Sequence, residues 1–479
     1  MRPSFLRTKP VTELATESAG DQHRLRRALG PWDLVAIGIG CIVGVGIFVL
    51  PGVEAATHAG PGIILSFAIA AAACACAALC YAELAAMIPV AGSAYTYGYA
   101  TLGELIAWII GWDLILEYMV GASLVAIGWS AYLVNLVNQI GRAWGWEIPH
   151  ALAAAPWGPN PGIANFPAVL VVAVLTWLLV RGIKESARVN LAMVITKVSV
   201  IVLFIVLTAR YVDPQHWKPF MPFGFSGVMT AAAIVFLAYV GFDAVSTTAE
   251  EAVNPQRDMP IGIMGSLLVA TVLYMAVAAI MTGIVPYQQL GVADPVALVL
   301  NHLDMRWASA FVSVGAVTGI TSVLLVLLLG QPRILFAMSR DGLLPPALSR
   351  VHPRFKTPYL TTLTTGGVVA VASALTPINV VAELCSIGTL FAFAIVSAGV
   401  IVLRYTRAGM PRPFRAPLFP LVPALGILLC GYLMLSLPGV TWLRFLVWLV
   451  LGLTIYTTYS YRRSHAARPA PAARTTDAG

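Results

Sequence analysis

Charged residues are scarce in this chain of 479 residues. Asp, Glu, Lys and Arg together make up 10% of it, whereas hydrophobic residues make up 59%. Soluble domains carry about 25% charged residues. A core surrounded by water could not hide so much apolar surface, so the composition excludes an ordinary soluble protein and indicates that lipid is the solvent.

Clusters of chemically reactive residues are also lacking. The six cysteines lie in apolar runs and form no Cys-x-x-Cys pair, so we expect them to pack as small apolar side chains. We find no Ser-His-Asp set, phosphate-binding loop or spaced group of metal ligands. We therefore expect no enzyme activity, no metal site and no cofactor.

Runs of about 20 apolar residues recur along the chain, which is the length that a bilayer-spanning helix needs. We expect an all-α membrane protein with twelve transmembrane helices. Polar tails at 1–30 and 463–479 bracket this domain at 31–462. The first tail lacks the apolar core of a cleavable signal peptide, so we expect an uncleaved first helix. The predicted helices lie near 32–55, 62–88, 104–138, 165–181, 189–210, 227–250, 260–285, 305–337, 358–376, 380–404, 417–437 and 439–461.

The basic residues gather on alternate loops. If the N-terminus lies inside, most of the 29 Lys and Arg residues fall in the two tails and in loops on that same side. This distribution follows the positive-inside rule. It predicts a multi-pass protein of the cell inner (plasma) membrane with both termini in the cytoplasm. It also explains the net charge of +8 without a nucleic acid partner.

Four glycines interrupt the first predicted helix, at Gly38, Gly40, Gly44 and Gly46. Each interior glycine weakens a helix by roughly 1 kcal/mol relative to alanine. In hydrocarbon, a broken backbone is tolerated only where protein or a water-filled cavity satisfies the freed N–H and C=O groups. The pattern predicts a mid-membrane break that forms a binding site. The alternative is that the glycines only let neighbouring helices pack closely.

The sixth predicted helix, 227–250, has a second possible break. Its run from Phe236 to Asp243 places Gly241 and a carboxylate in the middle of the apolar segment. The first and sixth helices are five apart, which is the spacing of an inverted repeat of five helices with discontinuous helices at corresponding positions. Together the two signals favour a transporter.

Two ionisable residues lie deep inside predicted helices. Lys197 is about eight residues into the fifth, near mid-membrane, where a lysine costs on the order of 3 kcal/mol. Burial favours the neutral amine, so Lys197 could exchange protons and couple proton flow to transport; the alternative is that it snorkels to the surface. Glu117, in the third helix, could contact a substrate amine, pair with a cation or brace the bundle.

Other acidic residues are less distinctive. Asp243 follows the second break and could line an inner vestibule. Asp113, Glu54, Glu83 and Glu383 lie close to predicted helix ends, where solvation is the default. The nearly uncharged loop at 89–103 is expected to fold back against the protein as a short helix.

These residues resemble the amino acid–polyamine–organocation superfamily, specifically bacterial relatives of the cationic amino acid transporters. The resemblance covers about Gly30 to Arg415, and it depends on several motifs in order rather than on one. They are Gly38–Phe48, Tyr81-Ala-Glu-Leu, 89–95, Trp112–Tyr118, Asn190–Lys197, Phe236–Glu251 and Pro332–Leu344.

The resemblance implies a leucine-transporter-like fold. Its two inverted five-helix repeats would span about 31–211 and 226–404, with two further helices at about 417–461. An amino acid would sit at the breaks, with its carboxylate against the N–H groups of Gly44, Val45 and Gly46, as the positive end of a half-helix favours. Its amine would meet carbonyls near Ile42, Leu237, Ala238 and Val240. In proton-coupled members a lysine of the fifth helix replaces a sodium ion, and Lys197 falls at that position.

Two residues depart from the family pattern. Val45 stands where many relatives have threonine or serine, so a side-chain hydroxyl is lost there. Leu237 stands where some relatives have an aromatic residue, so a roomier pocket is expected.

We therefore expect a secondary active amino acid transporter that imports its substrate with protons by alternating access. The alternatives are an amino acid or polyamine exchanger of the same fold and a non-transporting membrane sensor or partner-binding subunit. Glu117 is compatible with Arg or Lys substrates and equally with small neutral amino acids. The partners expected are an amino acid, the proton and the lipid bilayer.

Overall fold

The computed structural model describes residues 29–87, 93–141, 145–158, 160–181, 187–246, 252–292, 294–353, 355 and 357–463. The predicted tails lie almost entirely outside these residues, as do 89–92 of the predicted short helix at 89–103 and 247–250 of the sixth predicted helix.

Every named element of the described residues is helical, as an apolar chain in lipid requires, because a helix satisfies its own backbone groups. The α-helices are α2 (Pro31–Ile42), α3 (Val45–Phe48), α4 (Leu50–Glu54), α5 (Ile63–Met87), α6 (Ser93–Thr101), α7 (Glu104–Gly141), α8 (Phe166–Arg181), α9 (Ala187–Thr208), α10 (Gly224–Val235), α11 (Phe242–Ser246), α12 (Pro255–Ile284), α13 (Pro295–His302), α14 (Arg306–Arg340), α15 (Tyr359–Leu375), α16 (Ile378–Thr406), α17 (Leu421–Leu435), α18 (Gly439–Ile455) and α19 (Tyr461–Arg463).

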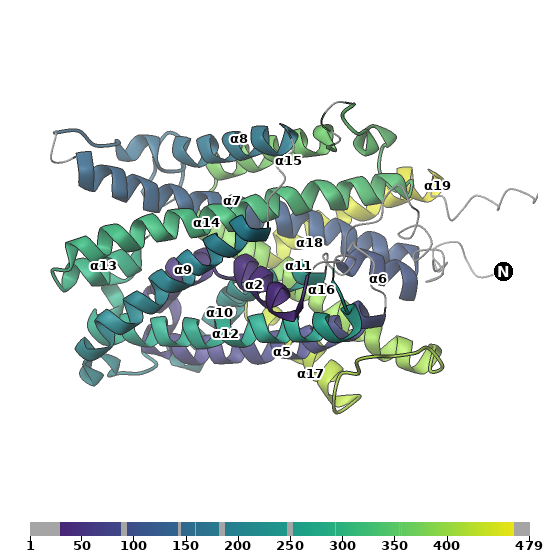
Figure 1. Ribbon diagram of the computed structural model, residues 1–479, viewed down its shortest axis with the longest axis horizontal. Helices are drawn as coiled ribbons and strands as arrows, with labels where there is room; N and C mark the ends of the chain where they lie inside the picture. Colours follow the sequence, from purple (N-terminus) through teal and green to yellow (C-terminus); the bar gives the residue numbers. More distant parts are fainter. Residues whose placement is uncertain are drawn as a thin grey trace, which may run out of the picture.

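Each of the predicted membrane-spanning intervals contains helix. Within the described residues, seven helical segments are long and apolar enough to cross a membrane, and five further apolar helices are shorter. Most of the long helices run along the longest axis of the molecule, with α8 and α15 side by side at one edge (Figure 1). The all-α architecture is confirmed, whereas the count of twelve spans and the inverted repeat stay predictions.

Both predicted helix breaks are present. The first helix stops at Ile42 and resumes at Val45, and Gly44 between them is extended, with φ −157° and ψ −131°. The sixth passes from α10 into a 3-10 turn at Phe236–Tyr239 and unwinds at Val240 before α11 begins. Gly241 has φ +122°, a conformation that glycine adopts without a steric penalty.

The short helix expected at 89–103 is confirmed for its described part, which is α6. Tyr95, Tyr97 and Tyr99 are all buried there, and the Tyr95 hydroxyl donates to Asp341 Oδ2 at 2.7 Å. This segment therefore packs into the protein at one end of the bundle instead of forming a solvated loop.

The helix α18 is fastened to α7 by paired tryptophans. Trp112 and Trp448 stack with ring centroids 4.4 Å apart. The Trp112 indole N–H donates to the Trp448 carbonyl at 2.8 Å, and the Trp448 indole N–H donates to the Trp112 carbonyl at 3.2 Å. This reciprocal pairing satisfies both indole donors inside an apolar region, where an unpaired donor would be costly.

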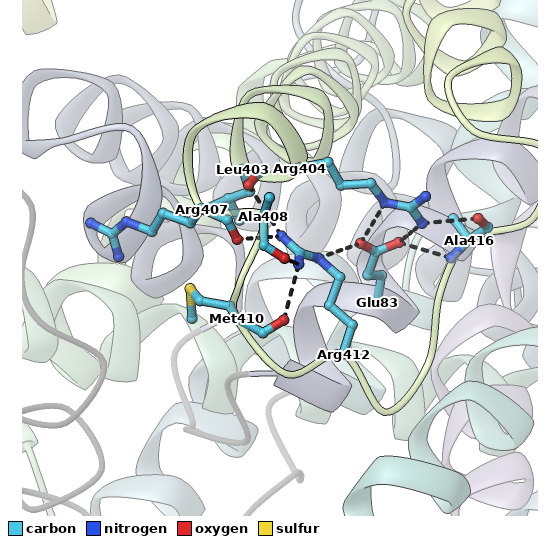
Figure 2. A network of polar contacts seen from close by, with 8 residues as sticks. All are labelled: Glu83, Leu403, Arg404, Arg407, Ala408, Met410, Arg412 and Ala416. Atoms are coloured by element: carbon cyan, nitrogen blue, oxygen red, sulfur yellow. Dashed lines mark hydrogen bonds and ion pairs between the residues drawn. The ribbon is translucent and has the colours of Figure 1, made fainter.

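Glu83 ties three segments together at the end of the bundle that carries α6. Figure 2 shows its carboxylate between Arg404 of α16 and Arg412 of the segment that follows. Arg404 donates from Nε at 3.0 Å and from Nη2 at 2.5 Å, while Arg412 Nε lies 3.5 Å away. The Ala416 N–H also donates to Glu83, at 2.8 Å. The expectation that Glu83 is solvated is wrong, because its side chain is only 1% exposed.

Replacing Glu83 should destabilise the fold. In Glu83→Ala, two arginines lose their buried counter-charge, which typically costs about 3–5 kcal/mol. We expect a clearly lower melting temperature of the purified protein in detergent. Arg415→Ala is the matched control, since Arg415 lies in the same segment but is exposed. Equal melting temperatures for the two variants would contradict this role of Glu83.

Candidate functional site

A cavity lies where the two broken helices meet. It holds about 660 Å³ of space not occupied by atoms, including space open to solvent. It is lined by all eight residues expected at the substrate site: Ile42, Gly44, Val45, Gly46, Glu117, Leu237, Ala238 and Val240. Residues separated by nearly 200 positions in the chain are therefore brought together as the motifs predict.

The broken ends present backbone groups to this cavity. Val45 and Gly46 open the half-helix α3, and the first N–H groups of any helix have no carbonyl one turn earlier to bond to. Ile47 and Phe48 already donate to the Gly44 carbonyl, at 3.1 and 3.3 Å. N–H donors at the positive end of a half-helix favour an anionic group such as a carboxylate.

Glycine is needed where the two breaks touch. A Cβ atom on Gly46 would lie 2.5 Å from Ala238 Cβ and 2.6 Å from Ala238 Cα. A Cβ atom on Gly241 would lie 3.0 Å from both the carbonyl carbon and Cβ of Cys41. The glycines thus serve close packing as well as unwinding, so close packing is not their only role; that the break forms a binding site stays a prediction.

Tyr274 of α12 bridges the two breaks, and sequence reasoning missed it. Its buried hydroxyl lies within donating distance of two carbonyl oxygens, those of Ile42 and Ala238, each 2.8 Å away. Both carbonyls were expected to meet a substrate amine, and each now has a protein partner as well. A tyrosine in an apolar helix gives no signal in one sequence that its hydroxyl will reach freed backbone groups.

Lys197 lies behind the first break and does not line the cavity. Its side chain is fully buried, so the snorkelling alternative is wrong. The ammonium donates to the Gly40 carbonyl at 2.5 Å, to the Val43 carbonyl at 3.0 Å and to Ser322 Oγ of α14 at 3.1 Å. A cation here satisfies carbonyls that the end of α2 leaves without helical partners.

Two carboxyl groups line the cavity. Asp243 accepts from the Gly241 N–H at 3.1 Å and from the Tyr118 hydroxyl at 3.3 Å, so it stabilises the unwound turn as well as facing the cavity. Glu117 is 1% exposed, and neither of its carboxyl oxygens has a hydrogen-bond partner in the described part of the chain. The Thr389 hydroxyl is near Glu117 but donates to the Cys385 carbonyl at 3.1 Å.

The remaining wall is apolar and was not foreseen. It comes mainly from α7 and α14, which pack against each other beside the breaks. Apolar residues in apolar helices carry no sequence signal that separates a pocket from a core or a lipid-facing surface. The apolar side chains that sequence reasoning missed include Leu50, Leu124, Val125, Val323, Val326 and Leu327.

Enlarging Gly46 should disturb the contact between the breaks. In Gly46→Ala, the added methyl group meets Ala238 backbone that cannot swing aside, and overpacking of this kind costs about 1–3 kcal/mol. We expect a lower melting temperature. Gly367→Ala on α15 is the control, because a Cβ there has no neighbour within 4 Å and alanine favours helix. A Gly46→Ala protein as stable as wild type would contradict the tight contact.

The sequence matches the amino acid permease family over residues 29–456. It is similar to the branched-chain amino acid permease BcaP of Bacillus subtilis, with 51% identity across 97% of this chain and 99% of that protein. A methylthioribose transporter of the same organism is 46% identical across 96% of this chain and 99% of its own length. The vacuolar cationic amino acid transporter 2 of Arabidopsis thaliana is 42% identical across 84% of this chain and 63% of its own length. The chain therefore belongs to the amino acid permease family, within the amino acid–polyamine–organocation superfamily, and is a multi-pass membrane protein.

Proposed function

We propose that this protein is a secondary active transporter that carries an amino acid into the cell together with protons, by alternating access. The observation that carries this proposal is the cavity between two apposed helix breaks. Such a cavity joins backbone hydrogen-bonding groups with an apolar wall, and an amino acid has a charged backbone and a variable side chain that match these two parts.

The substrate backbone is assigned to the breaks. Its carboxylate binds the N–H groups of Gly44, Val45 and Gly46. Its amine binds the remaining carbonyl lone pairs near Ile42, Leu237, Ala238 and Val240, with Glu117 facing the same cavity. A carbonyl oxygen has two lone pairs. The hydrogen bond from the Tyr274 hydroxyl therefore leaves one lone pair free to accept on each of the Ile42 and Ala238 carbonyl oxygens.

The substrate side chain is assigned to the apolar wall. Val125 and Leu124 of α7 face this space, as do Val323 and Leu327 of α14. A branched aliphatic side chain is the simplest match to such a surface. The name of the Bacillus subtilis permease, which is similar over nearly the whole chain, agrees with this assignment.

Lys197 is assigned to proton coupling. When charged, it holds carbonyls at the end of α2 against Ser322 of α14. When it releases its proton, the amine becomes a weaker partner for these carbonyls, and α2 is freer to move relative to α14. Proton binding and helix position are thereby linked. The proposed topology that accompanies this mechanism has twelve spans, two inverted repeats and both termini in the cytoplasm.

Uptake into liposomes tests this proposal. Purified protein is reconstituted, and leucine uptake is followed with and without an imposed pH gradient. We expect proton-driven accumulation in wild type and in the control Lys218→Met, whose lysine is exposed. In Lys197→Met we expect accumulation to lose its dependence on the gradient.

Other outcomes would favour the alternatives. Uptake that occurs only by counterflow against internal amino acid, without response to pH, would identify an exchanger. Amino acid binding without uptake in any condition would identify a sensor. Unchanged proton-driven uptake in Lys197→Met would refute the coupling role of this lysine.

The size of the side-chain space can be tested at Leu237. In Leu237→Trp, the larger ring fills part of the cavity, so we expect uptake of leucine to fall more than uptake of alanine. Competition by each amino acid against labelled leucine, compared with wild type, measures the change. Equal losses for both substrates would indicate that Leu237 does not border the substrate side chain.

A further inference from the structure

Glu117 of the cavity wall forms an acidic pair with Asp113, which does not line the cavity and has no role in the transport mechanism above. Asp113 lies one helical turn before Glu117 on α7, and residues four apart lie on the same helix face. Both side chains are at most 1% exposed. All four carboxyl oxygens are without a hydrogen-bond partner in the described residues. The expectation that Asp113 is solvated is therefore wrong.

The fold makes room for this pair. Asp113 packs against Gly388 of α16, where a Cβ atom would lie 3.0 Å from Asp113 Oδ1. Glu117 in turn lines the cavity. The pair therefore extends from the cavity, at Glu117, to the fully buried side chain of Asp113 one helical turn away.

A third unsatisfied side chain lies at the same level. Gly111 faces Met338, and Tyr118 faces Gly330, so α7 and α14 run antiparallel. In this register, Gln331 of α14 lies at the same height along the helices as Glu117 of α7. Gln331 is fully buried, and both its amide nitrogen and its amide oxygen are without partners in the part of the chain that the structure describes. An amide can donate to an ionised carboxylate and accept from a protonated one.

Among the residues that the structure describes, no ion pair balances the charge of these two carboxyl groups. The titratable groups that face the pair are Asp243 on α11, Cys385 on α16, Tyr81 on α5 and Tyr118 on α7 itself. Two adjacent carboxylates in an apolar environment cannot both stay ionised, so protons are the simplest way to neutralise them.

We propose that Asp113 and Glu117 form a second proton-binding site, distinct from Lys197. With the cavity closed to water, both groups hold a proton. When water reaches the cavity, Glu117 transfers its proton to water, and Asp113, which does not line the cavity, keeps its own. Closure returns a proton from water to Glu117. This inference depends on the proposed transport cycle, which supplies the alternation between wet and closed states.

Infrared spectroscopy of the purified protein in liposomes tests the protonation directly, without requiring activity. At neutral pH we expect the carbonyl stretch of buried, protonated carboxyl groups, which ionised carboxylates do not show. This band should weaken in Asp113→Asn and in Glu117→Gln. Two variants are used so that a folding defect in one leaves the other informative. Glu383→Gln is the control, because Glu383 is partly exposed, accepts from the Thr441 hydroxyl and lies 3.7 Å from Arg444.

The outcomes separate this inference from the transport proposal. An unchanged band in both variants would overturn the site. Loss of the wild-type band when sodium chloride replaces choline chloride at constant pH would also overturn it, since the pair would then bind a metal cation. Lys197→Met should keep the band while losing proton-driven uptake. If uptake depends on Lys197 but neither carboxyl variant changes the band, only this inference fails.

Discussion

The structure depends on the need to satisfy backbone groups where two helices break in an apolar environment. Each freed N–H or C=O group would cost several kcal/mol in hydrocarbon without a partner. The chain meets this need with side chains from distant helices. Lys197 of α9 donates to two carbonyls near the first break. The Tyr274 hydroxyl of α12 donates to one carbonyl of each break. The groups that remain face the cavity, where a ligand with opposite polarity can bind.

The same constraint explains why buried charge occurs in two forms here. Glu83 is buried with two arginines and a backbone N–H, so its charge is balanced and it fastens α5 to α16 (Figure 2). Asp113 and Glu117 are equally buried but have no such partners among the described residues. A balanced carboxylate stabilises one arrangement, whereas an unbalanced pair responds to water and protons. Under the proposed transport cycle, the second kind beside the cavity would link substrate access to proton movement.

Much of the fold and part of the cavity lining were predictable from the sequence. The apolar runs located the helices because lipid requires long uninterrupted apolar segments, and Gly44 and Gly241 marked the breaks because glycine weakens helices. The freed backbone at the first break follows from these signals, whereas the substrate site at Gly44, Val45 and Gly46 was implied by the family resemblance and stays a proposal. The apolar wall did not, since Val323 and Leu327 look like any other residue of an apolar helix. Solvation of Glu54, Glu83 and Asp113 was predicted wrongly, because position along a helix says nothing about which neighbours cover it.

By itself, the sequence determined that this protein is helical, lies in a membrane and has two interrupted helices. Composition and glycine positions decide these properties within each segment, whatever the packing of the helices. Only the tertiary structure decided what those interruptions do. It placed the two breaks against each other at Gly46 and Ala238, brought Lys197 and Tyr274 to the freed carbonyls and left Glu117 in the cavity wall. Such contacts join residues far apart in the chain, and their geometry is set by the packing of the whole bundle.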